Sequence, residues 1–115
     1  MSEARRGAYF KNYEAQAALA EGQGLMRQNR SADALPLLKR AVVLSSELYD
    51  HDRSMALATA QIELAECLID RDEPEQARAL LAEARAIYGS HRELGQQFTR
   101  PLRDLKHRIS QQAQH

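Results

Sequence analysis

The sequence predicts an all-α protein, a single domain of about five helices arranged as an antiparallel array of helical hairpins. Three observations lead to this prediction. The 115 residues are 43% apolar, mostly Ala and Leu, which are strong helix formers, whereas β-branched residues are few. Apolar residues recur at spacings of three and four along most of the chain, as in amphipathic helices. One stretch also occurs twice, which is typical of repeated helical units.

The repeated stretch is residues 65–89, which matches the chain about 43 residues earlier. It reads as the end of one helix, a short turn and a second helix. Small or aliphatic positions match in register, namely Gly22 with Ala65, Leu25 with Leu68, Ala34 with Ala77, Leu38 with Leu81 and Ala41 with Ala84. We therefore expect two equivalent helical hairpins, in residues 8–49 and 53–89.

The first hairpin follows a polar segment, residues 1–7, that we expect to be flexible. Its first helix is predicted over residues 8–29, with a stripe at helical spacing formed by Tyr9, Tyr13, Ala17, Ala20 and Gly24. Gly22 and Gly24 each lower helix stability by about 1 kcal/mol relative to Ala, so they indicate close approach of a neighbouring helix. Ser31 is the predicted N-cap of the second helix, residues 32–49.

The second hairpin is predicted to comprise helices over residues 53–71 and 74–88. Pro74 suits the first turn of a helix, and Gly89 suits a helix end. A further helix over residues 91–111 contains Pro101, where we expect a kink or a short break. This last helix lacks the small residues of the repeat, so we expect it to cap the C-terminal end of the array.

The two units, read from Ala15 and from Ala58, resemble tetratricopeptide repeats. The resemblance rests on the small and large residues paired above, and the longer period is similar to that of repeats of the kinesin light chain type. The sequence departs from the family pattern where an aromatic residue or Pro is common, at Ala18, Gln61, Ser46 and Gly89. An unrelated pair of helical hairpins is the alternative. Two repeats are few for independent stability, so either the last helix or a second copy of the chain is expected to complete the core.

Catalytic patterns are not evident in the sequence, and we predict no enzymatic activity, no cofactor and no metal site. The four His residues are scattered, without a pair at metal-binding spacing. Gly22-Gln23-Gly24 lies inside a predicted helix rather than after a strand, so it is not a phosphate loop. Cys67 lies next to buried positions of its helix and is interpreted as a packing residue rather than a reactive thiol.

The resemblance to tetratricopeptide repeats implies a partner-binding groove lined by the first helix of each unit. The implied lining residues are Gln16, Leu19, Ala20, Gln23, Met26, Arg27, Thr59, Ile62, Glu63, Glu66, Ile69 and Asp70. Three carboxylates of this set, Glu63, Glu66 and Asp70, share one helical face and favour a peptide with basic and apolar side chains. Alternatively, the last helix covers this face, and Arg103 and Lys106 neutralise the carboxylates within the chain.

The sequence therefore favours a non-catalytic adaptor module that binds another protein or a peptide. One alternative is self-association, in which the four apolar groove residues Leu19, Met26, Ile62 and Ile69 are buried against a second copy. The other is nucleic-acid binding by a basic run in the last helix, formed by Arg100, Arg103, Lys106, His107 and Arg108. A formal net charge of zero argues against nucleic-acid and membrane partners.

The remaining composition bears on where the protein works. The chain has no long apolar run, and its first residues lack the apolar segment of a signal peptide. The single Cys67 cannot form an internal disulfide, which suits a reducing cytoplasm. Arg outnumbers Lys and Ala is abundant, which favours a bacterial source with a GC-rich genome.

Overall fold

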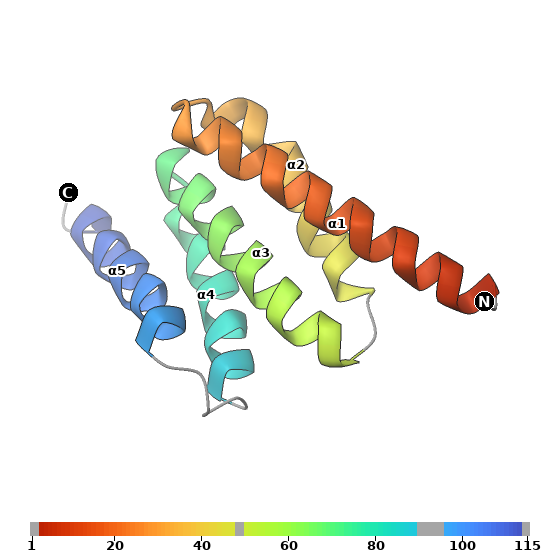
Figure 1. Cartoon of the computed structure of the whole chain (residues 1–115). Helices are drawn as coiled ribbons and strands as arrows, with labels where there is room; N and C mark the ends of the chain where they lie inside the picture. Colours follow the sequence, from red (N-terminus) through yellow and green to blue (C-terminus); the bar gives the residue numbers. More distant parts are fainter. Residues whose placement is uncertain (1–2, 48–49, 90–95, 114–115) are drawn as a thin grey trace.

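The computed structural model contains only helices among the residues that it describes, which are 3–47, 50–89 and 96–113. In chain order they are α1 (Glu3–Arg27), α2 (Ser31–Ser46), α3 (Asp50–Asp70), α4 (Pro74–Gly89) and α5 (Gln96–Ala113) (Figure 1). The predicted all-α class with five helices is thereby confirmed for this part of the chain. None of the described helices is long and apolar enough to cross a membrane.

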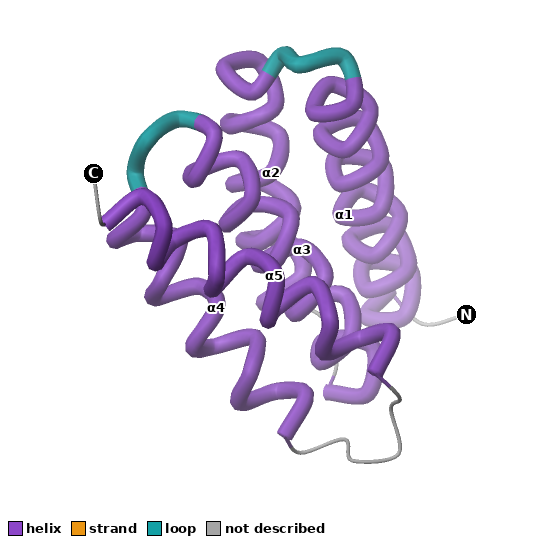
Figure 2. The backbone as a smooth tube through the Cα atoms, turned by 90° about the vertical axis from the view of Figure 1, so that its left-hand side faces the viewer, coloured by secondary structure: helices purple, strands orange, loops and turns teal. Residues whose placement is uncertain are grey.

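The helices form two layers. α1 packs along α2 and α3 along α4, and each second helix also packs against the first helix of the next unit, α2 on α3 and α4 on α5. α1, α3 and α5 lie in one layer and α2 and α4 in the other (Figures 1 and 2). The molecule measures 54 × 33 × 20 Å, and its smallest dimension equals about two helix diameters. The hairpins are therefore stacked side by side, as the sequence predicts.

The two hairpin turns are equivalent and lie at the same end of the molecule (Figure 2). Asn29 and Asp72, which occupy matching positions of the repeat, have φ angles of 59° and 63°. This left-handed conformation ends a helix in a Schellman-type turn. The next amide donates to the carbonyl five residues earlier in both turns, at 2.9 Å from Arg30 to Leu25 and 2.8 Å from Glu73 to Leu68. The repeat seen in the sequence is thus also a repeat of backbone geometry.

The matched small residues of the repeat lie where the helices cross. The four alanines of the second helices are completely buried, namely Ala34, Ala41, Ala77 and Ala84. Leu38 and Leu81, at the matching large position, are buried between them. Small residues at these positions let neighbouring helices approach closely, and the larger residue between them fills the remaining space.

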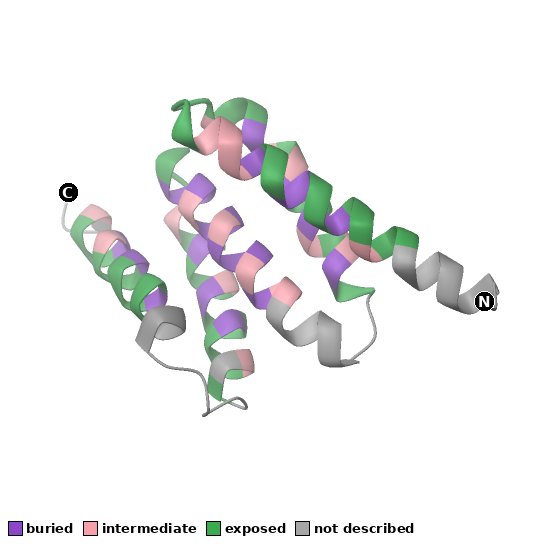
Figure 3. Ribbon diagram, viewed as in Figure 1, coloured by how far each residue is buried: buried purple, intermediate pink, exposed green. Residues whose placement is uncertain are grey.

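α1 buries a different face from the one that its most regular stripe predicted. Its buried residues are Ala15, Ala18, Leu19 and Gly22. Of the predicted stripe, Tyr13, Ala17 and Ala20 are exposed and Gly24 is half-buried, whereas the side chain of Tyr9 lies outside the described residues (Figure 3). The prediction was wrong because α1 is the first helix of the array and has neighbours on one side only.

α3 shows the opposite effect, since it lies in the middle of the array. Helical periodicity predicts one buried stripe for such a helix, and the adjacent Ala60 and Gln61 do not both belong to one stripe. Both are buried, and so are Ile62 and Ile69 on the side facing the other first helices. Packing against α2 and α4, with lighter contacts to α1 and α5, covers most of its circumference. Helical periodicity alone could not indicate how many faces are covered.

Several element boundaries differ from the predictions. α1 begins at Glu3, so Glu3–Gly7 is helical rather than flexible, because these residues are mostly good helix formers. Ser31 is the first residue of α2, whose N-cap is Arg30 and has no side-chain capping bond. Pro101 lies within α5 without a break in the helix. The predicted residues 48–49 of α2 and 91–95 of the last helix lie outside the described residues.

Gly22 permits the close crossing of α1 and α2, whereas Gly24 does not. A Cβ atom added at Gly22 would lie 2.5 Å from Cδ2 and 2.7 Å from Cγ of Leu38. A Cβ added at Gly24 would meet no atom within 4 Å. The expectation of a close neighbour therefore holds for Gly22 alone.

We expect Gly22→Ala to destabilise the fold and Gly24→Ala to stabilise it. Both changes gain about 1 kcal/mol of helix propensity, but the first also overpacks the α1–α2 crossing at a cost of roughly 1–3 kcal/mol. Urea unfolding of the two variants beside the wild type measures the difference. Equal stabilisation by both substitutions would contradict this prediction, because it would show that α1 and α2 can move apart without loss of folding stability.

Gln61 is a buried polar residue between α3 and α4. Its Nε2 donates to Oε2 of the exposed Glu83 at 2.7 Å, while its Oε1 has no hydrogen-bond partner among the described residues. A buried acceptor without a partner costs about 1–3 kcal/mol. The bond to Glu83 is weakened by exposure of that carboxylate to water, so it offsets this cost only in part.

Gln61→Met should therefore stabilise the protein by about 1 kcal/mol, because it keeps the side-chain length and removes the unpaired acceptor. Thermal or urea unfolding checks the value. Gln76→Met on the exposed face of α4 is the control, and we expect it to leave stability nearly unchanged. A less stable Gln61→Met protein would mean that the bond to Glu83 is the larger of the two effects.

Candidate partner-binding groove

The predicted groove residues lie on α1 and α3, in the layer that also contains α5. Their exposure divides them into three groups. Four are exposed, namely Gln16, Ala20, Arg27 and Asp70. Five are half-buried, namely Gln23, Met26, Thr59, Glu63 and Glu66. Three are buried, namely Leu19, Ile62 and Ile69.

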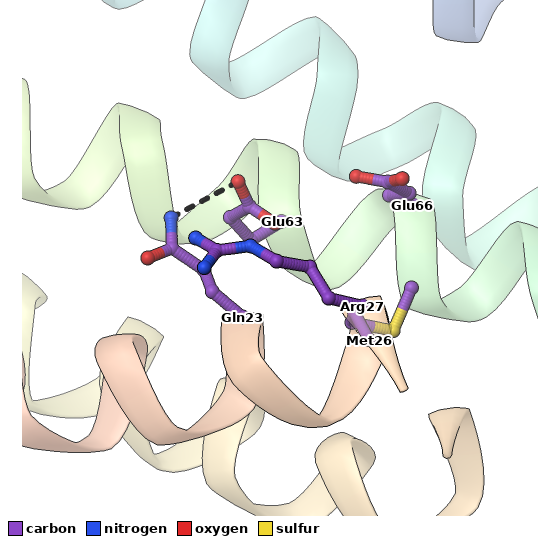
Figure 4. A pocket seen from close by; sticks show the side chains of 5 residues that line it. All are labelled: Gln23, Met26, Arg27, Glu63 and Glu66. Carbon is purple, nitrogen blue, oxygen red and sulfur yellow. Dashed lines mark hydrogen bonds between the residues drawn. The ribbon is translucent and has the colours of Figure 1, made fainter. Parts of the chain in front are cut away.

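A cleft of about 270 Å³ opens between α1 and α3, lined by Gln23, Met26, Arg27, Glu63 and Glu66 (Figure 4). All five lining residues belong to the groove predicted from the sequence. Ligand pockets for drug-sized molecules usually measure about 300–1,000 Å³ and are mainly apolar. This smaller cleft, with four polar side chains among five, matches a single long polar side chain better than a small-molecule ligand.

Polar contacts join the two helices at one end of the cleft. Nε2 of Gln23 donates to Oε1 of Glu63 at 3.1 Å. In Figure 4 the Arg27 side chain extends along the cleft, with its guanidinium directed toward the end formed by Gln23 and Glu63. The side chain of Met26 lies toward Glu66 in the same view.

α5 neutralises the other end of the acidic face. Nη2 of Arg108 lies 2.8 Å from Oδ1 of Asp70, with both side chains partly exposed. The predicted neutralising residues were Arg103 and Lys106, but both are exposed and neither forms an ion pair with the three carboxylates. The prediction of these two residues was wrong, because the register of α5 against α3 brings a different residue to this face. That residue is Arg108, next to the buried Ile109.

Glu66 lies between these two ends and has no hydrogen-bond or ion-pair partner within the described ranges. Burial raises its pKa above the ordinary value of 4.5, the charges of Glu63 and Asp70 raise the pKa further, and Arg108 lowers it in part. Its ionised form is therefore less stable in the folded chain than in water. Glu66 is the carboxylate of the groove that a basic group from outside could stabilise.

The apolar members of the predicted groove are part of the core. Leu19, Ile62 and Ile69 are at most 7% exposed, and Met26 packs against the same cluster. They are covered within one chain, because α3 packs against α2 and α4 and also contacts both α1 and α5. Of the four residues predicted to form a self-association surface, Leu19, Ile62 and Ile69 are therefore not available to a second copy, whereas the half-buried Met26 lines the cleft.

α5 contributes groove residues that the sequence analysis did not assign. Arg108 appeared only in a candidate nucleic-acid run, and Gln112, whose Nε2 donates to the carbonyl of Ile69 at 3.1 Å, was not considered. Arg108 and Gln112 are four residues apart, which places them on the same face of α5. The element that this face contacts depends on the position of α5. No sequence pattern specified that position.

Cys67 lies on α3, away from the cleft. It is fully buried, and its Sγ donates to the carbonyl oxygen of Ser31 on α2 at 3.2 Å. Burial raises the pKa of the thiol, and the charge of Asp70 raises it further. The thiol therefore stays protonated at neutral pH, and the low thiolate content suppresses nucleophilic reactivity.

The sequence matches no protein-family model, and comparisons with curated proteins and with solved structures find no match either. Among the residues described, no group of three or more His, Cys, Asp or Glu is placed to hold a metal ion. The resemblance to tetratricopeptide repeats rests on the residue pattern of the two units and stays a prediction.

Glu66→Gln should raise the thermal unfolding midpoint near pH 7. Because the folded-state pKa of Glu66 lies above its ordinary value, ionisation destabilises the folded state, and this loss grows as pH rises from the unfolded pKa through the folded one. The advantage of the Gln variant should therefore disappear below about pH 4, where Glu66 is protonated in both states.

Unfolding midpoints of both proteins across this pH range provide the measurement. Glu21→Gln, at an exposed position of α1, is the control and should show no comparable gain. A Gln variant that is no more stable than the wild type near pH 7 would contradict the unfavourable environment assigned to Glu66.

Proposed function

We propose that the protein is a non-catalytic interaction module whose groove, formed by α1, α3 and α5, binds a peptide or a helix of another protein through a basic side chain. The observation that carries this proposal is Glu66, a half-buried carboxylate with a raised pKa and no partner in the described chain. A Lys or Arg side chain entering the cleft would supply the missing opposite charge and hydrogen-bond donors.

The form of the cleft supports a macromolecular ligand rather than a small metabolite. Its volume of about 270 Å³ suits one side chain. Met26 provides an apolar surface next to Glu66, which suits the methylene groups of Lys or Arg. The helices beside the cleft leave further exposed polar residues, such as Gln16 and Arg27, for contacts along a bound segment.

The resemblance to tetratricopeptide repeats supports the same proposal, since that family binds peptides on its layer of first helices. The single Cys67, which cannot form an internal disulfide, is compatible with work in a reducing compartment such as the cytoplasm. The nucleic-acid alternative receives less support, because Arg108 of the basic run is paired with Asp70.

A selection from a random peptide library on the purified chain tests the proposal. We expect enriched peptides to contain Lys or Arg next to apolar residues, with affinities that weaken as salt concentration rises. Fluorescence polarisation with one selected peptide should show at least tenfold weaker binding to Glu66→Lys, because this change places like charges together.

Glu21→Lys introduces the same charge change at an exposed position outside the cleft, and its affinity should stay within about twofold of the wild type. Peptides without basic residues, or equal losses in the two variants, would contradict the proposed site. Reproducible turnover of a small molecule by the purified chain would overturn the non-catalytic function.

A further inference from the structure

α1 presents an outer stripe that the fold of a single chain leaves uncovered. We define it as Tyr13, Ala17, Ala20 and Gly24, which recur at helical spacing on the side opposite the buried Ala15 and Gly22. Tyr13 is 68% exposed, Ala17 and Ala20 are exposed, and no atom lies within 4 Å of a Cβ added at Gly24. In Figure 3 the outer side of α1 is green along much of its described length.

The internal repeat indicates what normally covers such a face. Two members of the stripe, Ala17 and Gly24, correspond to Ala60 and Cys67 of α3, which are completely buried. The other two, Tyr13 and Ala20, correspond to Ala56 and Glu63, which are half-buried. The covering element is α2, whose Ser31 carbonyl accepts the hydrogen bond from Cys67. α2 runs antiparallel to α3 (Figure 1). The equivalent face of α1 therefore suits an antiparallel helix, and in the described chain it has none.

The outer stripe is complementary to itself. If two α1 helices pair antiparallel about a two-fold axis between Ala17 and Ala20, Tyr13 of each faces Gly24 of the other. The open space at Gly24 accommodates the tyrosine ring, and the two alanines allow the helix axes to approach closely. A large residue thus meets a small one at both ends of the contact.

The charges beside the outer stripe are compatible with this pairing. One flank carries the uncharged Gln16 and Gln23. On the other flank Glu14 lies 3.3 Å from Arg40 of its own α2, so the charge of this carboxylate is offset where Glu21 of a second copy would approach. The formal net charge of zero adds no long-range repulsion between copies.

We propose that the outer stripe of α1 is a homodimer interface, in which α1 of a second copy packs antiparallel and takes the place that α2 occupies on α3. A contact between two single helices is small for a protein interface, so we expect a dissociation constant of roughly 10–100 µM. The interface does not use Glu66, although Ala20 belongs to the predicted groove and the flanking Gln23 lines the cleft. Association is therefore measured without a peptide, so its outcome is separate from that of the proposed peptide binding.

Sedimentation equilibrium of the full chain between about 5 and 500 µM tests the proposal. The wild type should shift from monomer to dimer. Ala17→Glu should weaken association at least tenfold, because it places a carboxylate at the centre of the contact. Ala82→Glu makes the same change at an exposed position of α4 and should leave association unchanged. Circular dichroism melts of both variants at low concentration verify that they are folded.

Cross-linking tests the direction of the pairing. In a mixture of Ala17→Cys and Ala20→Cys chains, mild oxidation should form the mixed disulfide faster than either symmetric one, because antiparallel pairing places positions 17 and 20 opposite each other. The natural Cys67 is buried and stays outside the reaction. A wild type that is monomeric at 500 µM, equal losses in both Glu variants, or faster symmetric disulfides would each overturn the proposed interface.

Discussion

The close crossing of the two helices in each hairpin is the constraint on which the rest of the structure depends. In the first hairpin the backbone of Gly22 lies against Leu38, too close for a side chain. In the second hairpin the matching residues, Ala65 and Leu81, are both buried. Because the helices of a hairpin lie so close, α2 and α4 each offer a second side to the next first helix. Stacking of the array follows from this geometry.

Stacking makes the position of a helix in the array as important as its sequence. α3 has neighbours on several sides, so apolar residues that seemed available to a ligand, such as Ile62 and Ile69, became part of the core. α1 has neighbours on one side, so its outer stripe remained exposed although it has the periodicity of a buried face. The same repeat pattern therefore produces a fully packed helix and a half-covered one.

The polar surface of the groove results from this packing. Since the apolar residues are buried, its surface is formed by polar side chains held from two sides, Gln23 of α1 on Glu63 and Arg108 of α5 on Asp70. These contacts are partly exposed and individually weak. Arg108 offsets the charge of Asp70, whereas the uncharged Gln23 only donates a hydrogen bond to Glu63, and Glu66 lies between them. A carboxylate in this position is unfavourable for the isolated chain.

The sequence by itself determined the helical class, the two equivalent hairpins, the positions of their turns and the small residues at their crossings. Helical periodicity and the 43-residue register depend only on the spacing of residue types along the sequence, which can be read directly. All five residues that line the cleft were also among those that the resemblance to tetratricopeptide repeats implied for the groove. The buried face of α1, the burial of Ile62 and Ile69, and the pairing of Arg108 with Asp70 were decided only by the tertiary structure. These features depend on which helices lie beside one another and in what register, and a helix with apolar residues on two faces does not specify which one its neighbours will cover.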